Sequence, residues 1–160
     1  MIHCMPKYII GVVYHRGDHI MLLLTNAKIF KNEQIKANLT NAQLEDLKDF
    51  DKIEETLFMC GLFAEENDIR LTTHPGPFNK LCSPNEQVVQ NTIKDLEVNG
   101  KMMDLLCQPR SPWAKINIHV GAAYNDKPMA LANFCKNFQR LSDAVKTRLT
   151  VENDDKESLY

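Results

Sequence analysis

The chain has 160 residues, of which 44% are hydrophobic and 25% are charged. This composition is typical of one globular domain and excludes a disordered chain, which would carry fewer apolar residues. The formal net charge of -2 excludes binding to nucleic acid through overall charge. Any such binding would need a local basic surface or bound metal ions.

Five cysteines are scattered along the chain without a close pair, which fits neither a disulfide framework nor a zinc spacing. We therefore expect reduced thiols in an intracellular protein. The apolar run at residues 8–14 is too short to span a bilayer and lacks a small-residue cleavage pattern, so we expect no membrane segment and no secretion. The cysteines are Cys4, Cys60, Cys82, Cys107 and Cys135.

The first third of the chain is the least patterned part. We interpret residues 8–19 as the last turns of a helix that stops at Gly17, in preference to a strand. Residues 20–26 begin with five apolar residues, end in Asn26 and predict the first strand. Residues 27–48 are polar, and we expect a long loop with a short helix near residues 41–47.

Two helix starts follow. Asp51-Lys-Ile-Glu54 resembles a capping box, and Ser83-Pro-Asn-Glu86 resembles another, with Ser83 as the N-cap and Pro84 at the first helical position. Apolar residues then recur on one face of each helix, and we expect the second helix to end at about Leu106. Gly100 lies inside this second helix and should cost about 1 kcal/mol relative to alanine.

A third helix opens at Asp126-Lys-Pro-Met129. It carries the most regular apolar stripe of the chain, and this stripe predicts one helix that continues to Val145. The residues of the stripe are Leu131, Phe134, Phe138, Leu141 and Val145.

Three further β-like runs alternate with these helices, and each brings a polar side chain to its end. Residues 69–73 lead to His74, residues 115–120 contain His119, and residues 148–152 end at Glu152. The alternation of strands and helices predicts a parallel sheet with right-handed crossovers. In such folds the working groups lie at the carboxyl ends of the strands.

His74, His119 and Glu152 each have a simple structural explanation when taken singly. They could be a turn histidine, a hydrogen-bonded core histidine and a solvated acidic residue. Taken together, two imidazoles and one carboxylate at the same end of neighbouring strands are typical ligands of a Zn or Mn site. A carboxylate can also bridge two ions in a site that cleaves a phosphodiester.

Four parallel strands are half of a (β/α)8 barrel, which typically needs about 250 residues. We therefore expect residues 1–160 to form a single partial domain with an α/β fold, an incomplete TIM-type barrel of about four parallel strands alternating with helices. Such a domain is either an open sheet or an incomplete barrel with exposed strand edges. A second chain that completes the barrel is one way to cover those edges.

Three motifs in order carry a resemblance to a known family. They are His74-Pro-Gly-Pro-Phe78 with a following Ser-Pro, Ile118-His-Val-Gly-Ala-Ala-Tyr-Asn-Asp-Lys127, and Leu149-Thr-Val-Glu-Asn-Asp-Asp155. These segments resemble HPGQ[FY]…SP, IHVGGxYGDK and LVLENDD of the UV damage endonucleases. The likeness covers roughly residues 12–160 and is close after residue 69. It departs at Pro77, where the family has Gln, and at Ala122, where the family has Gly.

The resemblance implies a TIM-barrel endonuclease that nicks damaged double-stranded DNA immediately 5′ to UV photoproducts, using divalent metal ions that are typically Mn(II). It implies that His74, His119 and Glu152 are catalytic metal ligands, with Glu152 as the bridging group. Phe78 matches an aromatic residue that probes the lesion. The positions expected on the DNA side of the site are Pro77, Phe78, Tyr124 and Lys127, of which the last two match motif positions without an assigned role.

Two other kinds of function stay open at this point. The chain could be a non-catalytic remnant, or a fragment that needs a partner chain, because its length is that of half a barrel. It could also be an abasic-site endonuclease or a sugar isomerase of the same barrel superfamily, since all of these use histidines and carboxylates at strand ends.

Overall fold

The computed structural model describes residues 11–16, 19–24 and 49–153, which form one α/β unit. Its strands are β1 (Gly11–Arg16), β2 (His19–Leu24), β3 (Arg70–Thr73), β4 (Ile116–His119) and β5 (Leu149–Glu152). Its helices are α2 (Phe50–Glu66), α3 (Glu86–Leu105), the 3-10 turn η2 (Pro112–Ala114), α4 (Lys127–Phe138) and α5 (Asp143–Lys146).

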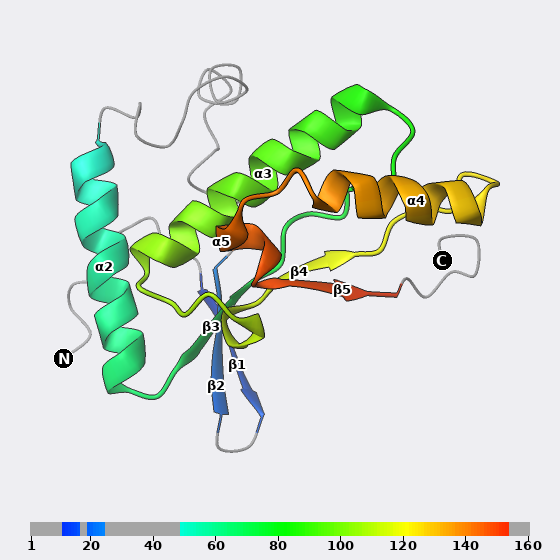
Figure 1. The fold of residues 1–160 in the computed structure, drawn as a ribbon. Helices are drawn as coiled ribbons and strands as arrows, with labels where there is room; N and C mark the ends of the chain where they lie inside the picture. The colour runs from blue at the N-terminus through cyan, green and yellow to red at the C-terminus, as the bar shows by residue number, and fades with distance from the viewer. Residues whose placement is uncertain (1–10, 17–18, 25–48, 154–160) are drawn as a thin grey trace.

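The five strands form one sheet in the order β1-β2-β3-β4-β5. The strands from β2 to β5 are mutually parallel, and β1 pairs antiparallel with β2 at the edge. Helices α2, α3, α4 and α5 lie on one side of this sheet (Figure 1). The predicted alternation of four parallel strands with helices is therefore confirmed.

The helix predicted for residues 8–19 is wrong where the structure describes this segment. Residues 11–16 form a strand that pairs with β2 over six residue pairs, from Gly11 with Leu24 to Arg16 with His19. Two valines and a tyrosine in this strand favour extended backbone, and the pairing with the next strand outweighs the weak helical pattern. The predicted loop and short helix at 27–48 lie outside the described residues.

Both predicted capping boxes are misplaced. Helix α2 begins at Phe50 with Asp49 as its N-cap, so Asp51 lies in the first turn, where its negative charge favours the helix dipole. Helix α3 is capped by Asn85, whose side chain accepts from the backbone N–H groups of Gln87 and Val88. Ser83 instead accepts from the N–H of Asn85 at 3.1 Å, which orients the true cap.

The third predicted helix is in fact two helices. Helix α4 ends at Phe138, and the Glu97 carboxylate of α3 accepts from the backbone N–H of Ser142 at 2.8 Å. That N–H is therefore bonded to another helix, and Ser142 becomes the N-cap of the short helix α5. The predicted stripe therefore does not lie on one helix. Its first three members belong to α4, and its last two, Leu141 and Val145, follow α4 and are buried in the core.

The core lies between the sheet and the helices, and the apolar stripes predicted for α2 and α3 face it. Its buried members include Leu57, Leu71, Leu96, Met103 and Ile118. Gly100 faces α5, and an added Cβ would come within 2.8 Å of a methyl group of Val145. The loss in helix propensity at Gly100 is thus accompanied by close packing of α3 on α5.

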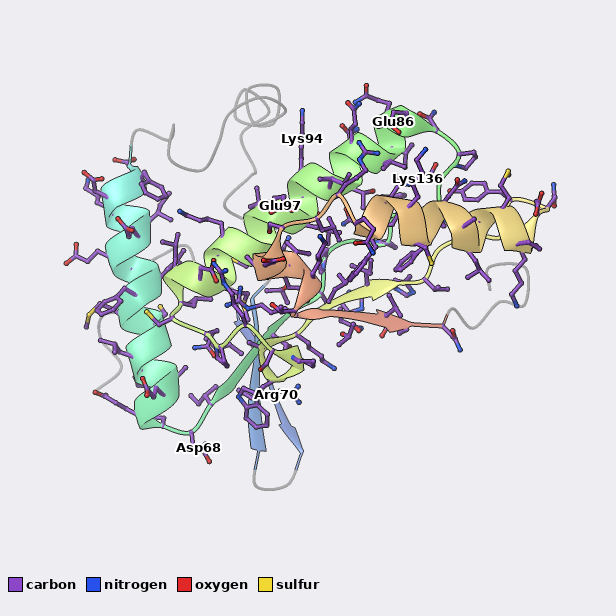
Figure 2. All side chains as sticks on the ribbon, in the orientation of Figure 1. Asp68, Arg70, Glu86, Lys94, Glu97 and Lys136 are labelled. Carbon is purple, nitrogen blue, oxygen red and sulfur yellow. The ribbon has the colours of Figure 1, made fainter. Side chains whose placement is uncertain are left out.

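Two polar contacts connect the outer parts of the fold, and Figure 2 labels one partner of each, Arg70 and Glu86. Arg70, at the start of β3, donates to the carbonyl oxygen of Trp113 at 2.6 Å and lies over the Trp113 ring. At the other end of the sheet, Arg140 pairs with Glu86 at 2.8 Å and so connects the segment after α4 to the start of α3. Among the described residues, no helix is both long and apolar enough to cross a membrane.

Arg148 is a fully buried charge just before β5, at the amino ends of the strands. Its guanidinium donates to Asp104 Oδ1 at 2.8 Å, and otherwise to backbone carbonyl oxygens. Those oxygens belong to Gly100, Gln108, Pro109 and Ala144. The side chain therefore connects the end of α3, the loop that follows it, and α5.

Asp104 should make folding pH-dependent through this cluster. Partial burial acts to raise the pKa of Asp104, but the hydrogen bonds from Arg110 and Arg148 outweigh it and hold this pKa below its ordinary value. A carboxylate with a lowered folded-state pKa stabilises above its unfolded-state pKa, and this contribution is lost as the pH falls through the folded-state value. We expect the difference in free energy of unfolding between wild type and Asp104→Asn to shrink below about pH 4, as measured by urea titration. A difference that stays constant with pH would contradict this assignment.

Candidate metal centre

His74, His119 and Glu152 meet at the carboxyl ends of three neighbouring strands. His74 directly follows β3, and His119 and Glu152 are paired in register as the last residues of β4 and β5. His74 Nε2 lies 2.9 Å from Glu152 Oε1, and His119 Nε2 lies 3.4 Å from the same oxygen. One possible ligand atom from each residue lies within 4.8 Å of the others. The structure thus brings together the three residues that strand-end reasoning selected.

Glu152 is held on both of its oxygens. Asn117 donates from Nδ2 to Glu152 Oε2 at 2.6 Å, and Thr150 in turn donates to Asn117 Oδ1 at 2.7 Å. The hydrogen bond from His74 lowers the pKa of Glu152, partial burial opposes this, and the bond from Asn117 and the two imidazoles lower it further. Glu152 is therefore kept as an oriented carboxylate, the form that binds a cation.

His74 is oriented by its other ring nitrogen. Nδ1 lies 3.2 Å from the carbonyl oxygen of Pro75, which can only accept a hydrogen bond, so this oxygen would hold a proton on Nδ1 when Nε2 binds a metal. A ligating histidine commonly donates its second N–H to a carbonyl in this way, and the other nitrogen is then free to bind the metal. The remaining nitrogen, Nε2, is the one that faces Glu152.

The donor set fits a divalent transition metal. Two imidazole nitrogens and one carboxylate suit Zn, Mn or Fe better than Mg or Ca, which prefer oxygen ligands. The three side chains are between one quarter and two fifths exposed, so an ion and its substrate could reach them from solvent.

The loop after β4 is packed tightly beside this group. Gly121 has a φ of +111°, and an added Cβ would come within 2.2 Å of the buried Cys82 sulfur. Only glycine fits this conformation and this contact. Cys82 also donates to the carbonyl oxygen of Ala122 at 3.5 Å, so the loops after β3 and β4 contact each other next to the site.

Three of the four residues expected on the DNA side lie on these same two loops, and the fourth begins the helix that follows the second loop. Pro77 and Phe78 are exposed in the loop after β3, and Phe78 is 86% exposed. Tyr124 is exposed in the loop after β4 with a φ of +50°, and Lys127 is the first residue of α4. Their positions put them on the same face as the three candidate ligands, because both loops follow the carboxyl ends of strands.

A cavity of about 220 Å³ lies between the loop after β4 and helix α4. Val120 and Asn153, the residues that follow His119 and Glu152, both line it, and Lys127 is part of its wall. The candidate ligands therefore stand beside a hollow in the surface rather than on a flat face.

Asn117 and Thr150, which support Glu152, were not predicted from the sequence, although the two-residue period of a strand indicates them. Asn117 lies two residues before His119, and Thr150 two residues before Glu152, so each points to the same side of the sheet as its neighbour. Alternate polar residues at the end of a buried strand are the signal for a second layer of supporting groups.

Comparison with known proteins gives this geometry a context. The family model described as UV-endonuclease UvdE matches residues 37–158. The chain belongs to the UV-endonuclease family. It is 43% identical over 103 residues to a UV-damage endonuclease of Neurospora crassa, and 38% identical over 105 residues to a UV DNA damage endonuclease of Clostridium perfringens.

The crystal structure of SacUVDE aligns with 75% of this chain and 40% of that chain, at a TM-score of 0.65 and 33% identity. The expected α/β fold of an incomplete TIM-type barrel is thereby confirmed. The match to the Neurospora protein covers 63% of this chain and 16% of that protein. The match to the Clostridium protein covers 66% of this chain and 25% of that protein. The chain thus spans about a quarter or less of the length of these UV-endonuclease relatives.

Proposed function

We propose that the chain carries part of the active site of a metal-dependent DNA endonuclease that cleaves the phosphodiester 5′ to UV photoproducts. The observation that carries this proposal is the convergence of His74, His119 and Glu152 from three adjacent strands on one carboxylate oxygen. Membership of the UV-endonuclease family supports DNA damage as the substrate class. A DNA substrate also places the protein inside the cell, where the DNA is.

The three residues would hold the divalent ion, for which we propose Mn(II). When bound, such an ion supplies a hydroxide-like nucleophile near neutral pH and stabilises charge on the phosphate and the leaving oxygen. The chain's own contribution is to orient the ligands. Asn117 fixes the plane of the Glu152 carboxylate, and the carbonyl of Pro75 would hold a proton on His74 Nδ1 when Nε2 binds the ion.

The exposed groups around the site would bind the DNA. Phe78 presents an apolar ring to solvent, and base stacking on such a ring is worth about 1–3 kcal/mol per base. Lys127, beside the cavity, would add positive charge towards phosphate, which a chain of nearly neutral net charge needs locally. Pro77 and Tyr124 would complete the surface on the same two loops.

A nicking assay tests the proposal. Wild type and Glu152→Gln are incubated with Mn²⁺ and an end-labelled duplex that carries one pyrimidine dimer. We expect wild type alone to cut immediately 5′ to the dimer. Parallel reactions with an undamaged duplex, an abasic-site duplex and a ketose sugar separate this activity from the related endonuclease and isomerase functions. Preference for the abasic site or the sugar would contradict the proposal, as would no cutting at enzyme excess both with and without a partner chain.

The expectation of a second chain that completes the barrel stays a prediction. Within the described part of the sheet, β5 pairs with β4 alone, so its other edge could accept a further strand. Nicking that appears only after a partner chain is added would favour this assembly. Nicking by the isolated monomer would exclude it as a requirement.

A further inference from the structure

The loop between β3 and α3 reverses the usual preference for burial. Phe78 is 86% exposed, whereas the neighbouring polar residue Asn79 is only 8% exposed. Asparagine is mostly found on the surface and phenylalanine inside, so this arrangement needs a specific cause. The cause must lie in what Asn79 binds.

The amide nitrogen of Asn79 donates two hydrogen bonds. Nδ2 donates to the carbonyl oxygen of Gly76 at 3.1 Å and to Asp95 Oδ2 at 2.6 Å. The backbone N–H of Asn79 also donates to Gly76 O, at 3.2 Å, which closes a turn with Phe78 inside it. A bond from an amide to a carboxylate is stronger than one between neutral groups. Asp95 therefore fastens this turn to helix α3.

A second contact fastens the adjacent residue to the same helix face. Thr92, which is 2% exposed, accepts from the backbone N–H of Lys80 at 3.0 Å. Thr92 and Asp95 are three residues apart and so lie on one side of α3. Two side chains of a rigid helix thus fix the backbone on the carboxyl side of Phe78.

We propose that Asp95 is a positioning residue that, through Asn79, fixes the turn of residues 76–79 and holds the Phe78 ring outward for DNA. A side chain that is already ordered loses less conformational freedom on binding. The DNA part of this inference rests on the proposed function, whereas the fixed turn does not. The three motifs that carried the family resemblance contain candidate ligands and lesion contacts, and neither Asp95 nor Asn79 is among them.

Fluorescence tests the turn without DNA or metal. Trp113 is the sole tryptophan of the chain, so Trp113→Phe with Phe78→Trp places a single reporter at position 78. We expect Asp95→Leu to lower the anisotropy of this reporter, because leucine cannot accept from Asn79. Asp95→Asn keeps an acceptor oxygen and should retain most of the anisotropy. Glu54→Leu, on the exposed face of α2, is the matched control and should change nothing.

DNA binding tests the consequence for recognition. Without the two tryptophan substitutions, Asp95→Leu should weaken binding to a pyrimidine-dimer duplex by about two- to tenfold. Binding to an undamaged duplex should change little. The same change in a Phe78→Ala background should have no further effect, since the two residues would act as one unit. A merely structural role for Asp95 would weaken binding equally in both backgrounds.

The outcomes separate this inference from the proposed function. Unchanged anisotropy in Asp95→Leu overturns the positioning role, whatever the DNA results. Equal binding of wild type to damaged and undamaged duplexes overturns the proposed lesion recognition and the DNA part of this inference, while the anisotropy still decides the turn. If Asp95→Leu does not fold, as judged by its thermal melt, Asn79→Ala cuts the same contact from the loop side and decides in its place.

Discussion

Glu152→Gln is expected to lower the affinity for Mn²⁺ by more than about a hundredfold. Loss of a supporting group around a metal already costs about 10–100-fold in affinity, and Glu152 is proposed as a ligand itself. It is also the sole anion among the three, so the substitution removes the direct attraction to a cation. The glutamine keeps the size of the side chain and an acceptor oxygen towards His74, so the fold should change little.

Calorimetric titration with Mn²⁺ measures this effect against graded variants. His74→Ala removes one neutral ligand and should weaken binding less than Glu152→Gln. Asn117→Ala removes the donor to Glu152 Oε2 and should cost about 10–100-fold. Glu66→Gln, on the exposed end of α2, is the charge-matched control. If Glu152→Gln binds Mn²⁺ as tightly as wild type does, Glu152 is not a ligand.

Arg148→Met is expected to destabilise the fold by about 3–5 kcal/mol. The arginine is completely buried, and its removal takes a donor away from Asp104 and from four backbone carbonyl oxygens. Methionine fills similar space but cannot donate. A domain is typically stable by about 5–15 kcal/mol, so this loss is a large part of the total.

Arg110→Met is the control, because Arg110 binds the same carboxylate from the surface. Its side chain is 56% exposed and pairs with Asp104 Oδ2 at 2.7 Å. Exposed pairs of this kind contribute about 0–1 kcal/mol. Denaturant unfolding of both variants gives the comparison. Equal losses for Arg110→Met and Arg148→Met would show that burial of the guanidinium carries no special weight.

The three candidate ligands could be predicted because their position follows from the chain's alternation of strands and helices. Parallel strands end at one edge of the sheet, so a polar residue at the end of each strand is brought to a common place. His119 and Glu152 are in direct register for this reason. The supporting contact from Asn117 follows from the same two-residue period and was predictable in principle.

The misjudged elements depend on contacts that local patterns do not contain. Residues 11–16 form a strand because six pairs with β2 favour it over a weak helical pattern. The segment between α4 and α5 is bonded to Glu97, 45 residues from Ser142 in the chain. The turn that Asp95 holds likewise joins residues 16 apart, and nothing near Asn79 in the sequence indicates its partner.

The central claim is that His74, His119 and Glu152 together bind one divalent ion, and pulsed electron paramagnetic resonance of the Mn²⁺-loaded protein tests it most directly. Nitrogen nuclei of coordinated imidazoles couple to the manganese electron spin, so the spectrum reports how many histidines are bound. We predict couplings from two imidazoles in wild type, and from one in each of His74→Ala and His119→Ala. Bound Mn²⁺ without nitrogen coupling, or a spectrum that neither substitution changes, would contradict the account.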